Sequence, residues 1–275
     1  MSYLEYYKLK EQPFSISVDN RFYYDSRQHS EALIRLKHAA TERKGLALLV
    51  GDIGCGKSTL AQRLLDELDD KQFESALLIV IHSSVTPKWL LRKIAVQLGV
   101  DPPAEDQTEL LGQLYTRLIE IHEKGRAAVV LVDEAQMLQS REVMEEFRGL
   151  LNMEMDGQKL ITFIFFGLSD LDQSLALDEP LRQRVALRYH LQGFSPEPSE
   201  EYIKFRLQIA GGQKELFTVS AYSAIHQYSK GLPRLINTIC DNALLEGFLR
   251  KKDRIDHAMI REIATDLNII SPNAP

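Results

Sequence analysis

The segment that most constrains the fold of this chain is Gly51-Asp-Ile-Gly-Cys-Gly-Lys-Ser58, which matches the pattern G-x-x-x-x-G-K-[ST] at every fixed position. A continuous apolar run, Leu46–Val50, stands before it, and short runs of this kind are typical of buried parallel strands. The residues after it, Ser58–Leu68, have the apolar spacing of an amphipathic helix. The pattern needs this strand–turn–helix context, so we expect the turn to form a phosphate-binding loop.

The residue types in this loop indicate how it would bind a nucleotide. Glycines let backbone N–H groups converge on phosphate oxygens, and the helix that follows points its positive end at the same anion. Lys57 is expected to reach the β- and γ-phosphates, and the Ser58 hydroxyl to ligate Mg²⁺. The residues expected to bind ATP here are Gly51, Asp52, Ile53, Gly54, Cys55, Gly56, Lys57, Ser58 and Thr59.

A second acidic element follows another apolar run, Ala127–Val132, which leads directly into Asp133 and Glu134. Carboxylates at the carboxyl end of a buried strand lie where ligands bind in open α/β sheets. We expect Asp133 to hold Mg²⁺ through water or through Ser58, and Glu134 to polarise the attacking water. The adjacent glutamate favours a hydrolase over kinases that share only the loop. The structural alternative is that the pair caps a following helix.

The order of expected elements predicts two kinds of domain. Strands alternate with helices in the first part of the chain, which indicates an α/β fold with a doubly wound parallel sheet, and a small all-helical domain follows. We divide the chain into an N-terminal segment 1–26, an α/β core 27–194 and a helical domain 195–275. The expected strands are 46–50, 75–82, 127–132, 160–166 and 185–190, and the expected helices are 29–43, 58–68, 86–99, 108–124, 140–155, 200–210, 220–229, 233–250 and 257–267.

Composition excludes several classes of protein. With 44% hydrophobic and 26% charged residues, the chain is typical of a soluble globular protein, and no apolar stretch is long enough for a membrane span. Two cysteines, Cys55 and Cys240, suit a reducing compartment, so a cytoplasmic location is expected. A formal net charge of −6 disfavours bulk coating of nucleic acid. Local basic patches at 88–93 and 250–254 remain, and their simpler interpretation is solvated helix ends.

Several motifs outside the loop identify a family. They include Gln12-Pro-Phe-Ser15, Val132-Asp-Glu-Ala-Gln136, Pro180-Leu-Arg-Gln-Arg184 and Gly231-Leu-Pro-Arg-Leu-Ile-Asn237. With them the chain, from about Tyr6 to Leu267, resembles the AAA+ ATPases typified by the general secretion pathway A (ExeA-type) proteins, which are related to the transposition ATPases TnsC and TniB. The resemblance implies a P-loop NTPase core with a helical lid. It also implies a homo-oligomeric ring or filament, which in this family is usually hexameric.

The resemblance also implies roles for residues outside the loop. Arg234 is similar to the sensor-2 arginine, which reaches from the lid to the γ-phosphate. Arg184, or failing it Arg182, is similar to an arginine finger inserted into the neighbouring subunit's site. A positive charge at either position would stabilise the negative charge that develops on the γ-phosphate during hydrolysis. The residues implied to line the adenine pocket are Gln12, Pro13 and Phe14, with Tyr23 or Tyr24 as ring neighbours.

Two departures from the family pattern bear on activity. The family's fourth strand usually ends in Gly-Gln-Pro, with the glutamine as sensor 1, whereas this chain has Gly167-Leu-Ser-Asp170. Ser169 is a candidate substitute, and we expect slow hydrolysis that suits a regulatory switch more than a fast motor. Secretion-type members also continue into a membrane span and a periplasmic domain, so this chain is either a stand-alone member or a fragment.

Three functions stay open at this point. The first is an ATPase of the secretion or pilus-assembly kind that acts on an envelope protein partner. The second is a DNA-associated transposition regulator, in which an ATP-bound filament or ring lies on duplex DNA and hydrolysis times its disassembly. The third is a nucleotide-binding scaffold with negligible turnover. The acidic net charge favours the first or the third, and a steep salt dependence of DNA binding would select the second.

Overall fold

The computed structural model describes residues 2–15 and 19–271, so the parts of segments 1–26 and 195–275 that fall on residues 1, 16–18 and 272–275 lie outside the described residues. The chain forms two compact units, which are described separately. The α/β unit consists of residues 27–51 and 57–191. The helical unit consists of residues 1–26, 52–56 and 192–275, so it includes the middle of the phosphate-binding loop.

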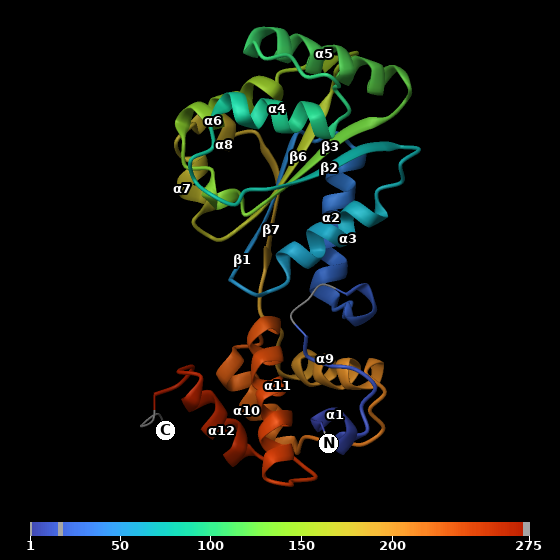
Figure 1. Cartoon of the computed structure of the whole chain (residues 1–275). Coiled ribbons are helices and arrows are strands. Elements are labelled where there is room, and N and C mark those ends of the chain that lie inside the picture. Colours follow the sequence, from blue (N-terminus) through green and yellow to red (C-terminus); the bar gives the residue numbers. More distant parts are fainter. Residues whose placement is uncertain (1, 16–18, 272–275) are drawn as a thin grey trace. The chain divides into compact units, whose positions relative to one another are not determined.

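A five-stranded parallel sheet in the order β2-β3-β6-β1-β7 forms the centre of the α/β unit (Figure 1). This arrangement confirms the predicted doubly wound parallel sheet. Its strands are β1 (Leu46–Gly51), β2 (Phe73–Ile79), β3 (Ala127–Asp133), β6 (Ile161–Gly167) and β7 (Val185–Leu191). The helical segments of this unit are α2 (Arg27–Thr41), α3 (Lys57–Glu67), α4 (Pro87–Gln97), α5 (Gln107–Glu123), η2 (Ala135–Met137), α6 (Arg141–Leu150), α7 (Leu171–Leu175) and α8 (Glu179–Arg182).

Helices cover both faces of this sheet (Figure 1). Leu48, Val130 and Phe163 point to the face that is covered by α4, α5 and α6, where they join one large apolar core. Alternate residues point to the opposite face, where α2 and α3 pack. Burial on both faces explains why β1 and β3 are continuous apolar runs without alternation. At the start of α4, Thr86 caps the helix and Pro87 is its first residue, so the helix expected over 86–99 begins within one residue of its predicted start.

The structure differs from the sequence prediction between α6 and β7. The helix expected over 140–155 ends at Leu150, and a two-stranded hairpin follows, formed by β4 (Glu154–Met155) and β5 (Gln158–Lys159). Its turn has Asp156 and Gly157 at positive φ (52° and 73°), which is the usual arrangement for an Asp-Gly hairpin. The short helices α7 and α8 were not predicted, because elements of five and four residues are too short to show a period.

The helical unit has an apolar core of its own. Its elements are α1 (Tyr3–Tyr7), η1 (Asn20–Phe22), α9 (Pro196–Ile209), α10 (Val219–Ser229), α11 (Pro233–Leu249) and α12 (His257–Asp266). The N-terminal segment, in which no helix or strand was predicted, contains α1 and η1, and its Tyr7, Phe14 and Phe22 are buried in this core. None of the helices in the described part of the chain is both long and apolar enough to span a membrane.

Candidate active site

The phosphate-binding loop connects β1 to α3, and a hydrogen bond joins its first residue to its lysine. Gly54 and Gly56 have φ values of 81° and 104°, which a residue with a Cβ rarely adopts. The Lys57 ammonium, on a residue that is only 7% exposed, donates a hydrogen bond to the Gly51 carbonyl at 2.9 Å. Cys55 is fully buried, which fits a small packing residue. The loop therefore holds a lysine charge at the carboxyl end of β1, where a phosphate group would be bound.

Arg234 contacts the loop through its main chain. Within the helical unit, the Arg234 N–H donates to the Gly54 carbonyl at 3.2 Å. A Cβ built on Gly54 would lie 2.6 Å from the Arg234 Cβ, which is too close for two carbon atoms. Arg234 follows Pro233 at the start of α11, and its side chain is exposed. A cation in the first turn of a helix is unfavourable for the helix dipole, which favours a functional reason for this arginine.

Asp133 ends β3 and lies beside the start of α3. Its carboxylate accepts the Glu134 N–H at 2.9 Å and is hydrogen-bonded to the Ser58 hydroxyl. Burial raises the pKa of Asp133 above its usual range, and these two hydrogen bonds act in the opposite direction. Hydroxyl and carboxylate oxygens are ligands that Mg²⁺ prefers. The pair therefore fits the predicted magnesium site.

Glu134 has a left-handed backbone, with φ 56° and ψ 35°. Such strain in a non-glycine residue is concentrated at functional sites. Its side chain makes no capping hydrogen bond to the short helix η2, so helix capping does not explain this glutamate. Instead, its carboxylate accepts a hydrogen bond from Gln136 Nε2 at 2.5 Å. Gln136 is the last residue of the motif Val132-Asp-Glu-Ala-Gln136, and no function was predicted for it from the sequence.

The two candidate finger arginines have different partners. Arg182 is paired with the Glu179 carboxylate through two hydrogen bonds, of 2.7 and 3.0 Å. Arg184 donates to the neutral side-chain amide of Asn152 at 2.5 Å. It directly precedes β7, whose first residue pairs with Leu46 at the start of β1. Arg184 therefore lies at the amino end of the parallel sheet, whereas the phosphate-binding loop leaves β1 at its carboxyl end.

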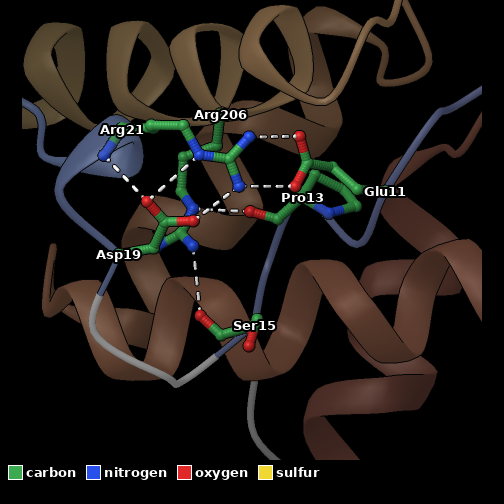
Figure 2. Close-up of polar contacts among 6 residues, drawn as sticks. All are labelled: Glu11, Pro13, Ser15, Asp19, Arg21 and Arg206. Atoms are coloured by element: carbon green, nitrogen blue, oxygen red, sulfur yellow. Dashed lines mark hydrogen bonds and ion pairs between the residues drawn. The ribbon is translucent and has the colours of Figure 1, made fainter.

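The three residues implied to line the adenine pocket lie in the N-terminal segment of the helical unit. Gln12 is exposed, whereas Phe14 is 3% exposed, with its ring 6.5 Å from that of Phe217. The Pro13 carbonyl accepts a hydrogen bond from Arg206 Nε at 2.5 Å. Arg206 also donates to the Ser15 carbonyl at 3.1 Å, as Figure 2 shows. A buried arginine of α9 thus fixes the path of this segment.

Tyr24, one of the two expected ring neighbours, packs against aromatic side chains of the same unit. Its ring lies 5.7 Å from Phe194 and 5.8 Å from Tyr202, and its hydroxyl donates to Glu201 at 2.5 Å. The structure thus accounts for Tyr24 by packing within the helical unit, and its role beside a nucleotide stays a prediction.

The arginines of the two basic patches are paired with neighbouring carboxylates. Arg250 is paired with Glu246 and Glu262, each at 2.6 Å. In the other patch, Arg92 is paired with Glu105 at 3.0 Å. Arginines held by carboxylates in this way offer little net positive charge to a phosphate backbone.

Comparisons with known proteins identify the family. The AAA domain family matches residues 40–175. The chain is 36% identical over 269 residues to General secretion pathway protein A of Aeromonas hydrophila, covering 97% of this chain and 48% of that protein. This chain therefore spans about half the length of that relative.

Among solved structures, the ORC2 protein of Aeropyrum pernix, in its ADPNP–ADP complexes, has a TM-score of 0.67 at 14% identity, covering 94% of this chain and 72% of that one. Drosophila ORC bound to DNA has a TM-score of 0.68 at 17% identity, covering 97% of this chain and 66% of that one. At such identities the likeness shows the fold alone. The AAA domain match and the secretion-pathway relative, taken with the loop and the acidic pair, identify the chain as an AAA+ P-loop ATPase of the general secretion pathway A type.

Proposed function

We propose that this chain binds ATP with Mg²⁺, hydrolyses it slowly, and couples its nucleotide state to the assembly of a homo-oligomer. One observation supports the hydrolytic part above all others. Ser58 and Asp133 form a hydrogen-bonded pair of oxygen ligands, and Glu134 follows directly at the carboxyl end of β3. This arrangement supports a magnesium site at Ser58 and Asp133, beside a carboxylate that would polarise water.

In this proposal each residue has a distinct task. Lys57 binds the β- and γ-phosphates, and the loop N–H groups orient the rest of the polyphosphate. Ser58 and Asp133 hold Mg²⁺, which when bound neutralises charge that develops on the phosphate oxygens. Glu134 orients the attacking water and withdraws its proton. Arg234, from the helical lid, would add positive charge at the γ-phosphate.

The position of Arg184 supports a role in trans. β1 runs from Leu46 to Gly51, and at about 3.3 Å per residue its length separates the amino end of the sheet from the loop by roughly 17 Å. Arg184, at that amino end, is too far from its own chain's loop to contact the γ-phosphate. It would instead reach the active site of a neighbouring subunit, which would make hydrolysis depend on assembly.

For the partner, we favour a protein at the cell envelope, as implied by the secretion-pathway relative, with this part of the chain on the cytoplasmic side. The acidic net charge and the carboxylate-paired arginines at 92 and 250 support a protein partner over DNA. The second candidate is an ATP-dependent filament or ring on duplex DNA. One of the similar solved structures, Drosophila ORC, is bound to DNA, which is the observation that favours this alternative.

Two variants test the hydrolytic part. Lys57→Ala is expected to abolish ATP binding, because it removes the charge that meets the β- and γ-phosphates. Glu134→Gln is expected to keep ATP binding and block turnover. Isothermal titration with ATP and Mg²⁺, together with phosphate release, separates the two effects. Equal loss of binding in both variants would show that Glu134 is wrongly assigned.

A further inference from the structure

The side chain of Gln136 links Glu134 to the end of a neighbouring strand. Its Nε2 donates to Glu134 Oε2 at 2.5 Å, and its Oε1 accepts the Leu168 backbone N–H at 3.1 Å. Because a carboxylate only accepts and a backbone N–H only donates, these partners fix which end of the amide faces which group. Gln136 is 7% exposed, and its main-chain carbonyl accepts the Ser174 hydroxyl at 3.4 Å. Both the side chain and the main chain of Gln136 are therefore held in place.

Gly167, the last residue of β6, leaves the space in which this amide lies. A Cβ built on Gly167 would be 3.0 Å from Gln136 Oε1 and 3.1 Å from Leu171 Cδ2, closer than carbon atoms usually approach these groups. Neither Gly167 nor Leu168 has a polar side chain, and Ser169, the next residue, is exposed. The polar group that lies at the end of β6 therefore comes from Gln136, in the turn after β3.

We propose that Gln136 is the positioning residue for Glu134, and that its amide supplies at the end of β6 the polar contact that Gly167 and Leu168 lack. The inference rests on the proposed function, in which Glu134 acts on the attacking water. A side-chain amide has two N–H donors. One can hold the Glu134 carboxylate while the other meets the attacking water or a γ-phosphate oxygen.

Two physical arguments favour this role. A neutral amide does not compete for the proton, so Gln136 can orient the base without replacing it. Because the same amide is bonded to Leu168, a shift of the end of β6 moves Gln136 and thereby Glu134. The position of Glu134 then depends on the position of β6, although the end of β6 itself carries no catalytic carboxylate. A base displaced by about 1 Å can lose about 100-fold in rate, so this link is sufficient to set turnover.

The first test uses Gln136→Met, which keeps the length of the side chain and removes both hydrogen bonds. We expect kcat to fall by about 10- to 100-fold, with KM and the affinity for a fluorescent ATP analogue changed less than about twofold. Gln97→Met is the matched control, because the Gln97 side-chain amide also bonds a backbone group: its Nε2 donates to the Leu77 carbonyl at 3.0 Å, on an exposed part of α4. It should turn over ATP at the wild-type rate. A Gln136→Met variant with wild-type kcat would overturn the inference.

A second variant tests the same link without touching Gln136. Gly167→Ala puts a methyl group against Gln136 Oε1 and should lower kcat in the same direction, again with little change in nucleotide affinity. Ser169→Ala removes the other candidate for this contact and should leave kcat unchanged. If Ser169→Ala lowers kcat while Gln136→Met and Gly167→Ala do not, Ser169 has this role and the inference is wrong.

A double-mutant cycle separates positioning from general loss of structure. If Gln136 acts through Glu134, then Gln136→Met should lower the residual turnover of Glu134→Gln no further, because the base is already absent. A full additive loss in the double variant would contradict the inference. Failure of the proposed function gives a different result, since Glu134→Gln would then retain wild-type turnover. If Glu134→Gln is inactive and Gln136→Met is fully active, the proposed function stands and only the inference fails.

Discussion

The Arg234 N–H donates to the Gly54 carbonyl at 3.2 Å, and the two residues are so close that a Cβ on Gly54 would lie 2.6 Å from the Arg234 Cβ. Gly54 therefore satisfies two constraints, a φ of 81° and a close approach by α11. The first turn of α11 rests directly on the middle of the phosphate-binding loop. A nucleotide that reshapes this loop would thus act on the helix that carries Arg234.

We expect Gly54→Ala to weaken ATP binding by at least about tenfold, because the new methyl group clashes with Arg234 and the positive φ becomes strained. Gly112→Ala is the control. Gly112 lies in α5, and a Cβ there meets no atom within 4 Å. It should bind ATP normally and be more stable than wild type by about 0.5–1 kcal/mol. Titration with ATP and urea unfolding test both variants, and normal binding by Gly54→Ala would contradict the account.

For Arg234 itself, we expect Arg234→Ala to lower kcat by about 10- to 100-fold, since in the proposed function this arginine would add positive charge at the γ-phosphate. Arg234→Lys keeps a charge but not the planar guanidinium, so it should recover only part of the loss. Phosphate release under saturating ATP measures both. If the alanine and lysine variants are equally impaired, charge at this position is not what matters. Wild-type turnover in Arg234→Ala would remove this residue from the active site.

Mixing two inactive variants tests whether Arg184 acts in trans. Arg184→Ala has an intact phosphate-binding loop, and Lys57→Ala has an intact Arg184. Each alone should lose most of its turnover, because a trans arginine is worth about 10³- to 10⁵-fold in related phosphoryl-transfer enzymes. Their mixture should regain activity, since some interfaces combine one good loop with one good arginine. A mixture as inactive as its components would rule out this arrangement, and Arg182→Ala should remain active.

Arg206 and Arg21 lie in the same group of contacts in Figure 2 and should differ in their effects on stability. Arg206 is 6% exposed and donates to the Pro13 and Ser15 carbonyls, so Arg206→Ala should lower the free energy of unfolding by about 3 kcal/mol. Arg21 is exposed, and its pairing with Glu11 is a surface contact. Arg21→Ala should leave the urea midpoint nearly unchanged. Equal midpoints for the two variants would show that Arg206 does not anchor the N-terminal segment.

The sequence was sufficient to predict the sheet, the phosphate-binding loop and the acidic pair, because each depends on local pattern. Leu46–Val50 and Ala127–Val132 are apolar on both faces, which is typical of buried strands. A glycine-rich turn between such a strand and a helix is typical of a phosphate-binding loop. The contact between Gln136 and Leu168 could not be predicted in this way. It depends on the left-handed backbone of Glu134 and on the space above Gly167, which appear only when β3 and β6 lie side by side.

Two other features show the same limit. The Asp156-Gly157 pair is typical of a hairpin turn. The two strands beside it have only two residues each, so the sequence shows no strand pattern there, and the helical pattern before them led to a helix being predicted through 155. The N-terminal segment has buried aromatic side chains whose partners lie far along the chain, as with Phe14 and Phe217. Local patterns cannot identify such partners.

The most direct test of nucleotide-driven assembly is light scattering on a size-exclusion column, with the Glu134→Gln variant, ATP and Mg²⁺, in the presence and absence of duplex DNA. We expect an oligomer that forms with ATP, does not form with ADP, and does not retain DNA. An ATP-dependent oligomer that retains DNA would support the second candidate function in place of an envelope partner. A monomer at high protein concentration with ATP and Mg²⁺ would show that nucleotide does not drive assembly of this chain.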